Sequence, residues 1–269
     1  LGARATLGFR RDECDDRLTA SLVYDRAEHE VLRWLRLFAL LGADASDTRL
    51  AAPTPTEGDD AAARALLAPL ALAGGPLVGL HPGAKDPARR WPPECFAALA
   101  DTLAARYGAQ IVLTGVASER ATTAAVRRLM HAPALDLAGA TGIGSLTALV
   151  ASLDLLIAND TGVAHLAVAT ETPSVRLIGP GQPDEWLPLD RARHQVVDAR
   201  QLAAPNVDAA TALRELPVAP VVEACARVIG PHPLSPSPVR GRGGTAAALI
   251  ASSPSPAGRE RGAGGEGRR

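Results

Sequence analysis

The chain has 269 residues, which is enough for one large domain or two small ones. Its formal net charge of −1 gives no electrostatic basis for nucleic acid as the main partner. Aromatic residues make up only 3% of the chain, so a core must be built mainly from Ala, Leu and Val. No apolar run approaches the roughly eighteen residues that span a bilayer, and the opening residues lack a signal-peptide pattern.

The cysteines indicate the redox compartment of the protein, and the first residue indicates a truncation. Cys14, Cys95 and Cys225 lie far apart without metal-ligand spacing, which suits a reducing compartment and argues against a disulfide framework. The chain starts at Leu1 and its only methionine is Met130, so we expect an amino-terminal truncation with residues missing upstream.

The first 72 residues predict few regular elements. Residues 1–24 mix charged and apolar positions without a firm period and predict a loop with at most one strand. Residues 26–41 follow helical spacing and end before Gly42, while 51–56 are extended and 59–72 predict a second helix. Residues 73–76, Ala-Gly-Gly-Pro, predict a linker between two domains.

After the linker, apolar strands alternate with helices. The predicted strands are 77–81, 110–114, 134–137, 154–158, 174–178 and 194–197, and the predicted helices are 92–107, 118–130, 145–153, an Ala-rich segment after residue 161, and 218–229. This alternation predicts an α/β fold with a doubly wound parallel sheet over residues 77–230. Ligands bind such sheets beyond the carboxyl ends of the strands.

The composition changes after residue 230. Residues 231–269 are rich in Pro, Gly, Ser and Arg and poor in large apolar side chains, so we predict a disordered tail. A basic nucleic-acid-binding arm and read-through of non-coding sequence are the alternatives that this composition leaves open.

The loop after the first strand of the regular domain predicts a phosphate site. Gly83 and Ala84 form a small turn at the end of the strand, and a helix begins at Pro92. Three cations fall within six residues between them, at Lys85, Arg89 and Arg90. A glycine turn, fixed cations and a helix N-terminus together favour an anion, although a solvated basic loop is the simpler interpretation.

The stretch from Leu155 to Ala167 predicts the opposite half of the same site. A buried strand breaks at Asn-Asp-Thr-Gly and continues as an Ala-rich helix, where Asp160 or Thr161 can cap and Gly162 permits close approach. Unpaired N–H groups at that junction favour an anion, and Thr161 and His165 share one helix face. The alternative is an ordinary capped turn with a core histidine.

Three weaker candidates follow other strands. Glu119 is well placed to accept hydrogen bonds from ribose hydroxyls, and capping the following helix is an equally simple task for it. The backbone around Gly139 can line a purine slot. The Gly- and Pro-rich loop 177–188 either shapes the sugar end of the site or is only a turn.

These motifs occur in a fixed order along the chain. They are His81-Pro82-Gly83-Ala84, Arg90-Trp91-Pro92-Pro93-Glu94, Leu113-Thr114-Gly115 with Glu119, the Asn-Asp-Thr-Gly-Val-Ala-His-Leu-Ala run from Asn159, and Ile178-Gly179-Pro180. In this order they resemble glycosyltransferase family 9, whose best-known members are ADP-heptose:lipopolysaccharide heptosyltransferases. The resemblance is strong over about residues 77–190 and weaker over 20–45.

The resemblance implies a two-domain GT-B enzyme that inverts the anomeric centre, requires no metal or other cofactor, and moves a heptosyl unit from ADP-heptose to a lipopolysaccharide core acceptor. Residues 1–72 would be the remnant of the acceptor domain and 77–230 the donor domain. The enzyme would be cytoplasmic, with no transmembrane segment, and would meet its lipid A–core acceptor at the inner membrane face.

The resemblance also assigns roles to residues. Thr161 and Gly162 would face the diphosphate, Asp160 the sugar hydroxyls and Glu119 the ribose, while His165 completes the pocket. Arg89 would stabilise the leaving group, at a position where the family commonly has Lys. The general base would be an acid early in the amino-terminal domain, so no residue of this sequence can be named as the base.

Two alternatives remain. A family member using another sugar or acceptor fits the same motifs, and so does a sugar-nucleotide-binding module without catalysis. A dinucleotide-binding Rossmann domain is disfavoured because no Gly-x-Gly-x-x-Gly opens any of the βα units.

Overall fold

The computed structural model describes residues 5–10, 18–70, 74–181 and 185–229, all within one unit that spans Leu1–Ser237. The tail predicted to be disordered, 231–269, lies outside the described residues.

The amino-terminal segment contains two strands where the sequence predicted at most one. β1 (Leu7–Arg10) and β2 (Ala20–Val23) pair in parallel, and α1 (Glu30–Ala39) follows. Both strands have half-buried residues at most positions and therefore no clear alternation of apolar and polar side chains. The Phe9 ring makes edge-on contacts with Tyr24 and Trp34, which joins both strands to the helix.

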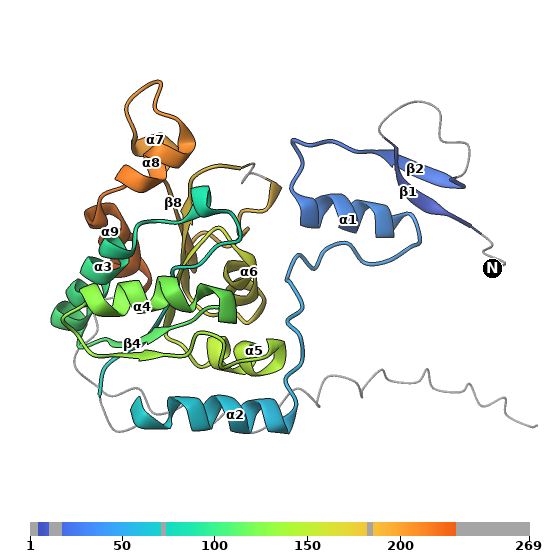
Figure 1. Ribbon diagram of the computed structural model, residues 1–269. Helices are drawn as coiled ribbons and strands as arrows, with labels where there is room; N and C mark the ends of the chain where they lie inside the picture. Colours follow the sequence, from blue (N-terminus) through green and yellow to red (C-terminus); the bar gives the residue numbers. More distant parts are fainter. Residues whose placement is uncertain (1–4, 11–17, 71–73, 182–184, 230–269) are drawn as a thin grey trace, which may run out of the picture. The chain divides into compact units, whose positions relative to one another are not determined.

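A six-stranded parallel sheet organises the rest of the chain (Figure 1). Its strands are β3 (Leu77–His81), β4 (Gln110–Leu113), β5 (Ala134–Asp136), β6 (Leu155–Asn159), β7 (Ser174–Ile178) and β8 (His194–Asp198). Their spatial order is β5-β4-β3-β6-β7-β8, so the chain winds outward from β3 in one direction and then returns to wind outward from β6. The predicted doubly wound parallel sheet is confirmed.

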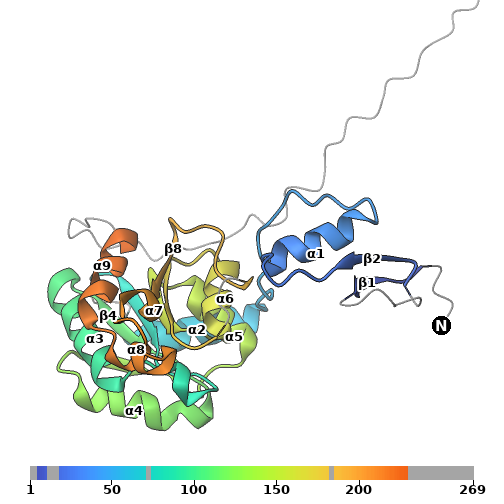
Figure 2. The ribbon, with the colours of Figure 1, turned by 90° about the horizontal axis from the view of Figure 1, so that it is seen from above.

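Helices cover both faces of this sheet (Figure 2). On one face lie α3 (Pro93–Tyr107), α4 (Arg120–Leu129), α8 (Ala209–Glu215) and α9 (Val218–Ile229); on the other lie α2 (Glu57–Leu67), α5 (Ile143–Ala151) and α6 (Gly162–Ala169). Short helices η1 (Ala68–Leu70), η2 (Pro87–Arg89), η3 (Ala117–Glu119) and α7 (Ala199–Leu202) lie in the connections. The sequence did not predict α7 and α8, because both are short and lack a sustained apolar period.

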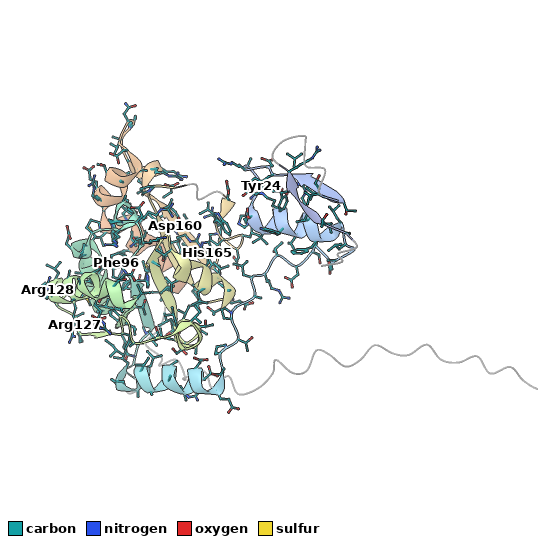
Figure 3. The ribbon with its side chains drawn as sticks, turned by 45° about the vertical axis from the view of Figure 1, so that its right-hand side comes forward. Tyr24, Phe96, Arg127, Arg128, Asp160 and His165 are labelled. Carbon is teal, nitrogen blue, oxygen red and sulfur yellow. The ribbon has the colours of Figure 1, made fainter. Side chains whose placement is uncertain are left out.

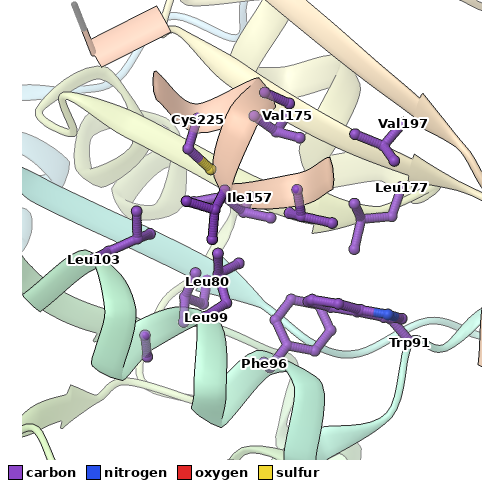
Figure 4. Close-up of a cluster of buried hydrophobic side chains, with 14 of the residues drawn as sticks. Leu80, Trp91, Phe96, Leu99, Leu103, Ile157, Val175, Leu177, Val197 and Cys225 are labelled. Carbon is purple, nitrogen blue, oxygen red and sulfur yellow. The ribbon is translucent and has the colours of Figure 1, made fainter. Parts of the chain in front are cut away.

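The apolar runs of the central strands divide between the two faces, as successive side chains of a strand must. Leu155 and Ile157 of β6 face α3 and α9, whereas Leu156 faces α5 and α6. Figure 4 shows the first of these clusters, where Phe96 and Leu99 of α3 pack below the strand side chains. Continuous apolar strands are therefore explained by burial on both faces.

The packing of α2 differs from the predicted domain boundary. Helix α2 was expected to belong with residues 1–72, but Ala63 is 2% exposed and packs in the cluster with α5 and the sheet. Leu66 and Leu67 pack against the same cluster. Helix α2 therefore packs against α5, on one side of the parallel sheet.

The winding order fixes where a ligand can reach the sheet. β3 and β6 are paired neighbours, but the connections that follow them leave in opposite directions, so a crevice is expected between these connections at the carboxyl edge of the sheet. The predicted phosphate loop follows β3, and the Asp-Thr-Gly motif follows β6, so the topology places them side by side.

The core on the α3 face supports a direct stability prediction. Replacing Leu99, which is fully buried against the sheet, with Ala should lower the free energy of unfolding by about 2–5 kcal/mol. The matched change Leu129→Ala, at the exposed end of α4, should cost less than about 1 kcal/mol. Urea unfolding of both variants measures the difference, and equal losses would contradict this packing.

Candidate functional site

Asn159, the last residue of β6, ties together the two loops that face the crevice. Its side chain is fully buried, and Oδ1 accepts a hydrogen bond from the Trp91 backbone N–H at 3.0 Å. Its Nδ2 donates to the carbonyls of Pro82 at 2.9 Å and Gly83 at 3.3 Å. One amide thus fixes both ends of the 82–91 loop relative to β6.

The turn at Gly83 is closed by a carboxylate. A Cβ atom at Gly83 would lie 2.1 Å from Cδ of Glu119, so a side chain there would require the Glu119 carboxylate to move. Oε2 of Glu119 accepts from the Val116 N–H at 2.9 Å and lies 3.6 Å from Nε2 of His81. The His81 ring contacts Thr114 Oγ1 at 3.1 Å, and burial lowers the pKa of His81 against the opposing effect of the carboxylate.

Glu119 therefore caps its own turn with one oxygen, a task close to the capping role that the sequence left open beside ribose binding. Its Oε1 has no hydrogen-bond partner among the described residues, so one oxygen remains for a ligand hydroxyl. The neighbouring Gly139 adopts φ +70°, and a Cβ there would lie 2.9 Å from Cα of Ala117. A glycine is required at that turn by the backbone itself.

The start of α6 has unsatisfied donors. Thr161 is the N-cap residue, but its side chain makes no capping hydrogen bond, and its Oγ1 is buried without a partner in the part of the chain described. Gly162 is exposed, and a Cβ there would meet nothing within 4 Å. Open space beside free N–H groups at a helix N-terminus is the arrangement that binds phosphate oxygens.

Two arginines flank the carboxylate next to that helix start. Arg89 Nη1 lies 3.6 Å from Asp160 Oδ2, and Arg176 Nη1 lies 3.5 Å from Asp160 Oδ1. The side chain of Arg89 is 38% exposed and that of Arg176 only 2%, so Arg89 is the cation that a ligand can reach. Lys85 is exposed and the structure gives it no contact with the other predicted residues.

His165 joins this group from the first turns of α6. Its ring packs edge-on against Trp186 with centroids 5.8 Å apart, and Nδ1 lies 3.3 Å from Nη2 of Arg176. Burial, and then the Arg176 charge, lower the pKa of His165 to about 4. Asp160 and His165 lie near one another in Figure 3, away from Arg127 and Arg128 of α4 at the left edge.

A cavity of about 430 Å³ adjoins this group. Apart from His165, Arg176 and Trp186, its lining is Val168, Glu171, Leu187 to Asp190, Arg193 and His194, with His29, Val31 and Thr48 to Leu50 of the amino-terminal segment.

The structure thus brings together most of the predicted site residues at the β3 and β6 strand ends. Arg176 and the bridging role of Asn159 were not predicted from the sequence. The signal for Arg176 was available as a single charge inside the apolar strand Ser-Val-Arg-Leu-Ile. No three His, Cys, Asp or Glu side chains converge to hold a metal ion in the described ranges, and no helix there could cross a membrane.

Known proteins resemble this chain in sequence and in fold. The family described as glycosyltransferase family 9 (heptosyltransferase) matches residues 1–216. The chain belongs to glycosyltransferase family 9. Lipopolysaccharide heptosyltransferase 2 of Salmonella typhimurium is 38% identical over 119 residues, 42% of this chain and 34% of the relative, and the Escherichia coli enzyme of the same name is 37% identical over the same shares.

The aligned segment spans about a third of the length of these curated relatives. Solved structures share the fold. A family 9 glycosyltransferase from Veillonella parvula matches with a TM-score of 0.69 at 23% identity over 79% of this chain and 63% of its own. The E. coli ADP-heptose LPS heptosyltransferase II matches with a TM-score of 0.64 at 24% identity over 85% and 70%. The α/β fold is therefore that of the family 9, GT-B type structures.

The Asn159 bridge yields a prediction. Changing Asn159 to Ala leaves one backbone donor and two carbonyls without their buried partner, so the free energy of unfolding should fall by about 1–3 kcal/mol or more. Urea unfolding measures the loss, and proteolysis should become faster within residues 82–91. A variant as stable and resistant as the native chain would show that the bridge is dispensable.

The lowered pKa of His165 predicts how the free energy of unfolding depends on pH. The folded pKa of His165 is about 4, below the value of 6.5 for a free histidine, so the unfolded state binds more protons between those values. Stability should therefore rise with pH across that window and be lost as pH falls through it. Unfolding of the His165→Gln variant between pH 4.5 and 6.5 should take up fewer protons than unfolding of the native chain. The difference should be about one proton at most. Urea titrations at several pH values test this, and an unchanged slope would contradict it.

Proposed function

We propose that this chain forms the donor-binding part of a heptosyltransferase that uses ADP-heptose. The observation that carries the proposal is the start of α6, where the Thr161 hydroxyl is buried without a partner among the described residues and Gly162 borders open space. A diphosphate supplies the acceptor oxygens that this helix N-terminus lacks. The family membership and the heptosyltransferase names of the relatives support heptose as the sugar.

The roles of the remaining residues follow from charge and access. Arg89 is the reachable cation, and it neutralises charge that develops on the departing ADP. Asp160, which lies between two arginines, accepts hydrogen bonds from sugar hydroxyls. Oε1 of Glu119 accepts from the ribose, and the backbone at Gly139 lines the purine slot. Gly83 and Ala84 keep the loop close to the site, and Lys85 adds a cation at its rim.

The reaction we propose is transfer of the heptosyl unit, with inversion and without metal, to a lipopolysaccharide core acceptor. It would take place in the cytoplasm at the inner face of the membrane. The general base is expected from the acceptor domain, and we assign none in this chain. Fixed cations and helix N–H groups can replace a metal at the diphosphate, since both stabilise negative charge without reorganising.

The donor half of the proposal predicts a ligand-induced thermal shift. ADP should raise the melting temperature of the chain, since a ligand that binds only the folded state stabilises it. Gly162→Val should remove most of the shift by filling the open space, and Arg89→Ala should weaken ADP binding by about tenfold or more.

Matched controls are available in the same fold. Gly58→Val places the same side chain in the first turn of α2, where the nearest atom to the new Cβ is 3.7 Å away. Arg106→Ala removes an arginine at the end of α3, at the amino edge of the sheet. Neither control should change the ADP shift. Asp160→Asn should weaken ADP-heptose more than ADP, and equal losses would reassign Asp160 to a structural role.

Transfer is tested with ADP-heptose, a heptose-deficient lipopolysaccharide core and EDTA, by measuring released ADP and the heptosylated product. Product formation in EDTA supports the metal-independent reaction. If ADP-heptose binds but no acceptor releases ADP, the chain is a sugar-nucleotide-binding module.

A further inference from the structure

The buried arginine of β7 is the unexplained feature of this site. Arg176 stands third in Ser-Val-Arg-Leu-Ile, and its side chain is 2% exposed. A buried guanidinium is costly unless its donors are satisfied, so its contacts should show what it is for.

The guanidinium of Arg176 reaches three separate elements. Nη1 donates to the carbonyl of Trp186 at 2.9 Å, in the loop between β7 and β8, and lies 3.5 Å from Asp160 Oδ1 after β6. Nη2 lies 3.3 Å from Nδ1 of His165 on α6. Arg176 thus links the loop that bears Asp160, the helix that bears His165 and the loop that bears Trp186.

The contact with His165 determines which ring nitrogen carries the proton. Arginine has only donors, so a hydrogen bond from Nη2 requires Nδ1 of His165 to be an unprotonated acceptor. A neutral imidazole must then carry its hydrogen on Nε2. That nitrogen has no hydrogen-bond partner among the residues described.

We propose that Arg176 is a positioning residue that holds His165 as the neutral Nε2–H tautomer, so that Nε2 donates a hydrogen bond to an oxygen of the bound sugar nucleotide. The last clause rests on the function proposed above. The tautomer itself follows from the contacts of Arg176 alone.

The charges around His165 act in the same direction. Burial, Arg176 and His29 lower the pKa of His165, and only the Asp160 carboxylate opposes them. Asp160 is itself shared with Arg89 and Arg176. The cavity beside the ring brings further charged or titratable groups, namely Arg49, Glu171, Asp190, Arg193 and His194.

A neutral His165 ring, as a hydrogen-bond donor, has a specific use beside Asp160. A protonated His165 would compete with sugar hydroxyls for the carboxylate, whereas a neutral ring leaves that carboxylate free to accept from the ligand. Binding of the donor should then be nearly independent of pH between about 5.5 and 8, a range above the folded pKa of His165.

The tautomer is measured without any ligand. Long-range ¹H–¹⁵N spectra of histidine-labelled protein, with His165 assigned through His165→Gln, should show a bare Nδ1 and a protonated Nε2 that do not titrate between pH 5.5 and 8. In Arg176→Met, His165 should titrate with a midpoint at least about one pH unit higher and lose its tautomer preference. Arg176→Lys, which keeps a charged donor, should restore part of the native behaviour.

Arg193→Met is the matched control, since it makes the same change at a side chain that is 45% exposed and donates to the Glu171 carbonyl. It should leave the His165 signals unchanged. The ADP-heptose dissociation constant should rise by about tenfold at pH 6 in Arg176→Met and less at pH 8.

A native His165 with a protonated Nδ1, or one that titrates near pH 6.5, would overturn the proposal even if Arg176→Met failed to fold. An unchanged tautomer in a folded Arg176→Met would also overturn it. The predicted tautomer in a protein that binds no ADP would instead reject the proposed function and leave the role of Arg176 intact.

Discussion

The site depends on one amide. Asn159 ends the strand that begins the second half of the sheet, and it hydrogen-bonds the loop that leaves the first half. The two halves wind in opposite directions, so nothing else in a parallel sheet requires their loops to stay in register at the carboxyl edge. A side-chain amide suits this position because it offers a donor and an acceptor in one plane and carries no charge to bury.

The balance of charge at the site differs from the net charge of the whole chain. The formal net charge is −1, yet the β6–α6 junction combines a helix N-terminus with Arg89 and the buried Arg176 around a single carboxylate. One acid between two arginines leaves an excess of positive charge that is available to an anion. His165, with its lowered pKa, adds a hydrogen-bond donor at neutral pH without adding charge.

Much of the fold followed from the sequence where local signals and burial agree. β3 and β7 have the predicted bounds, and α3 ends at Tyr107 as predicted, with Gly108 in the left-handed conformation as its C-cap. The sequence did not predict the short elements β1, β2, α7 and α8 in full. These elements gain their stability from tertiary contacts, so their sequences lack a regular repeat of apolar residues. The candidate loops came from strand ends and glycines, whereas Arg176 lies mid-strand, and only the folded chain shows that its fork reaches three other segments.

Gly83 and Gly162 differ in the reason for which glycine stands at each position. At one of them the reason lies in the fold, and at the other it lies in the site. At Gly83 the space of a side chain is filled by the Glu119 carboxylate, so glycine keeps that carboxylate in place whether or not a ligand binds. At Gly162 the backbone is helical and the space is open, so helix geometry alone would favour almost any other residue over glycine. A glycine that lowers helix stability, placed next to a buried hydroxyl without a partner, is best explained by something outside the chain that must approach the first turn of α6.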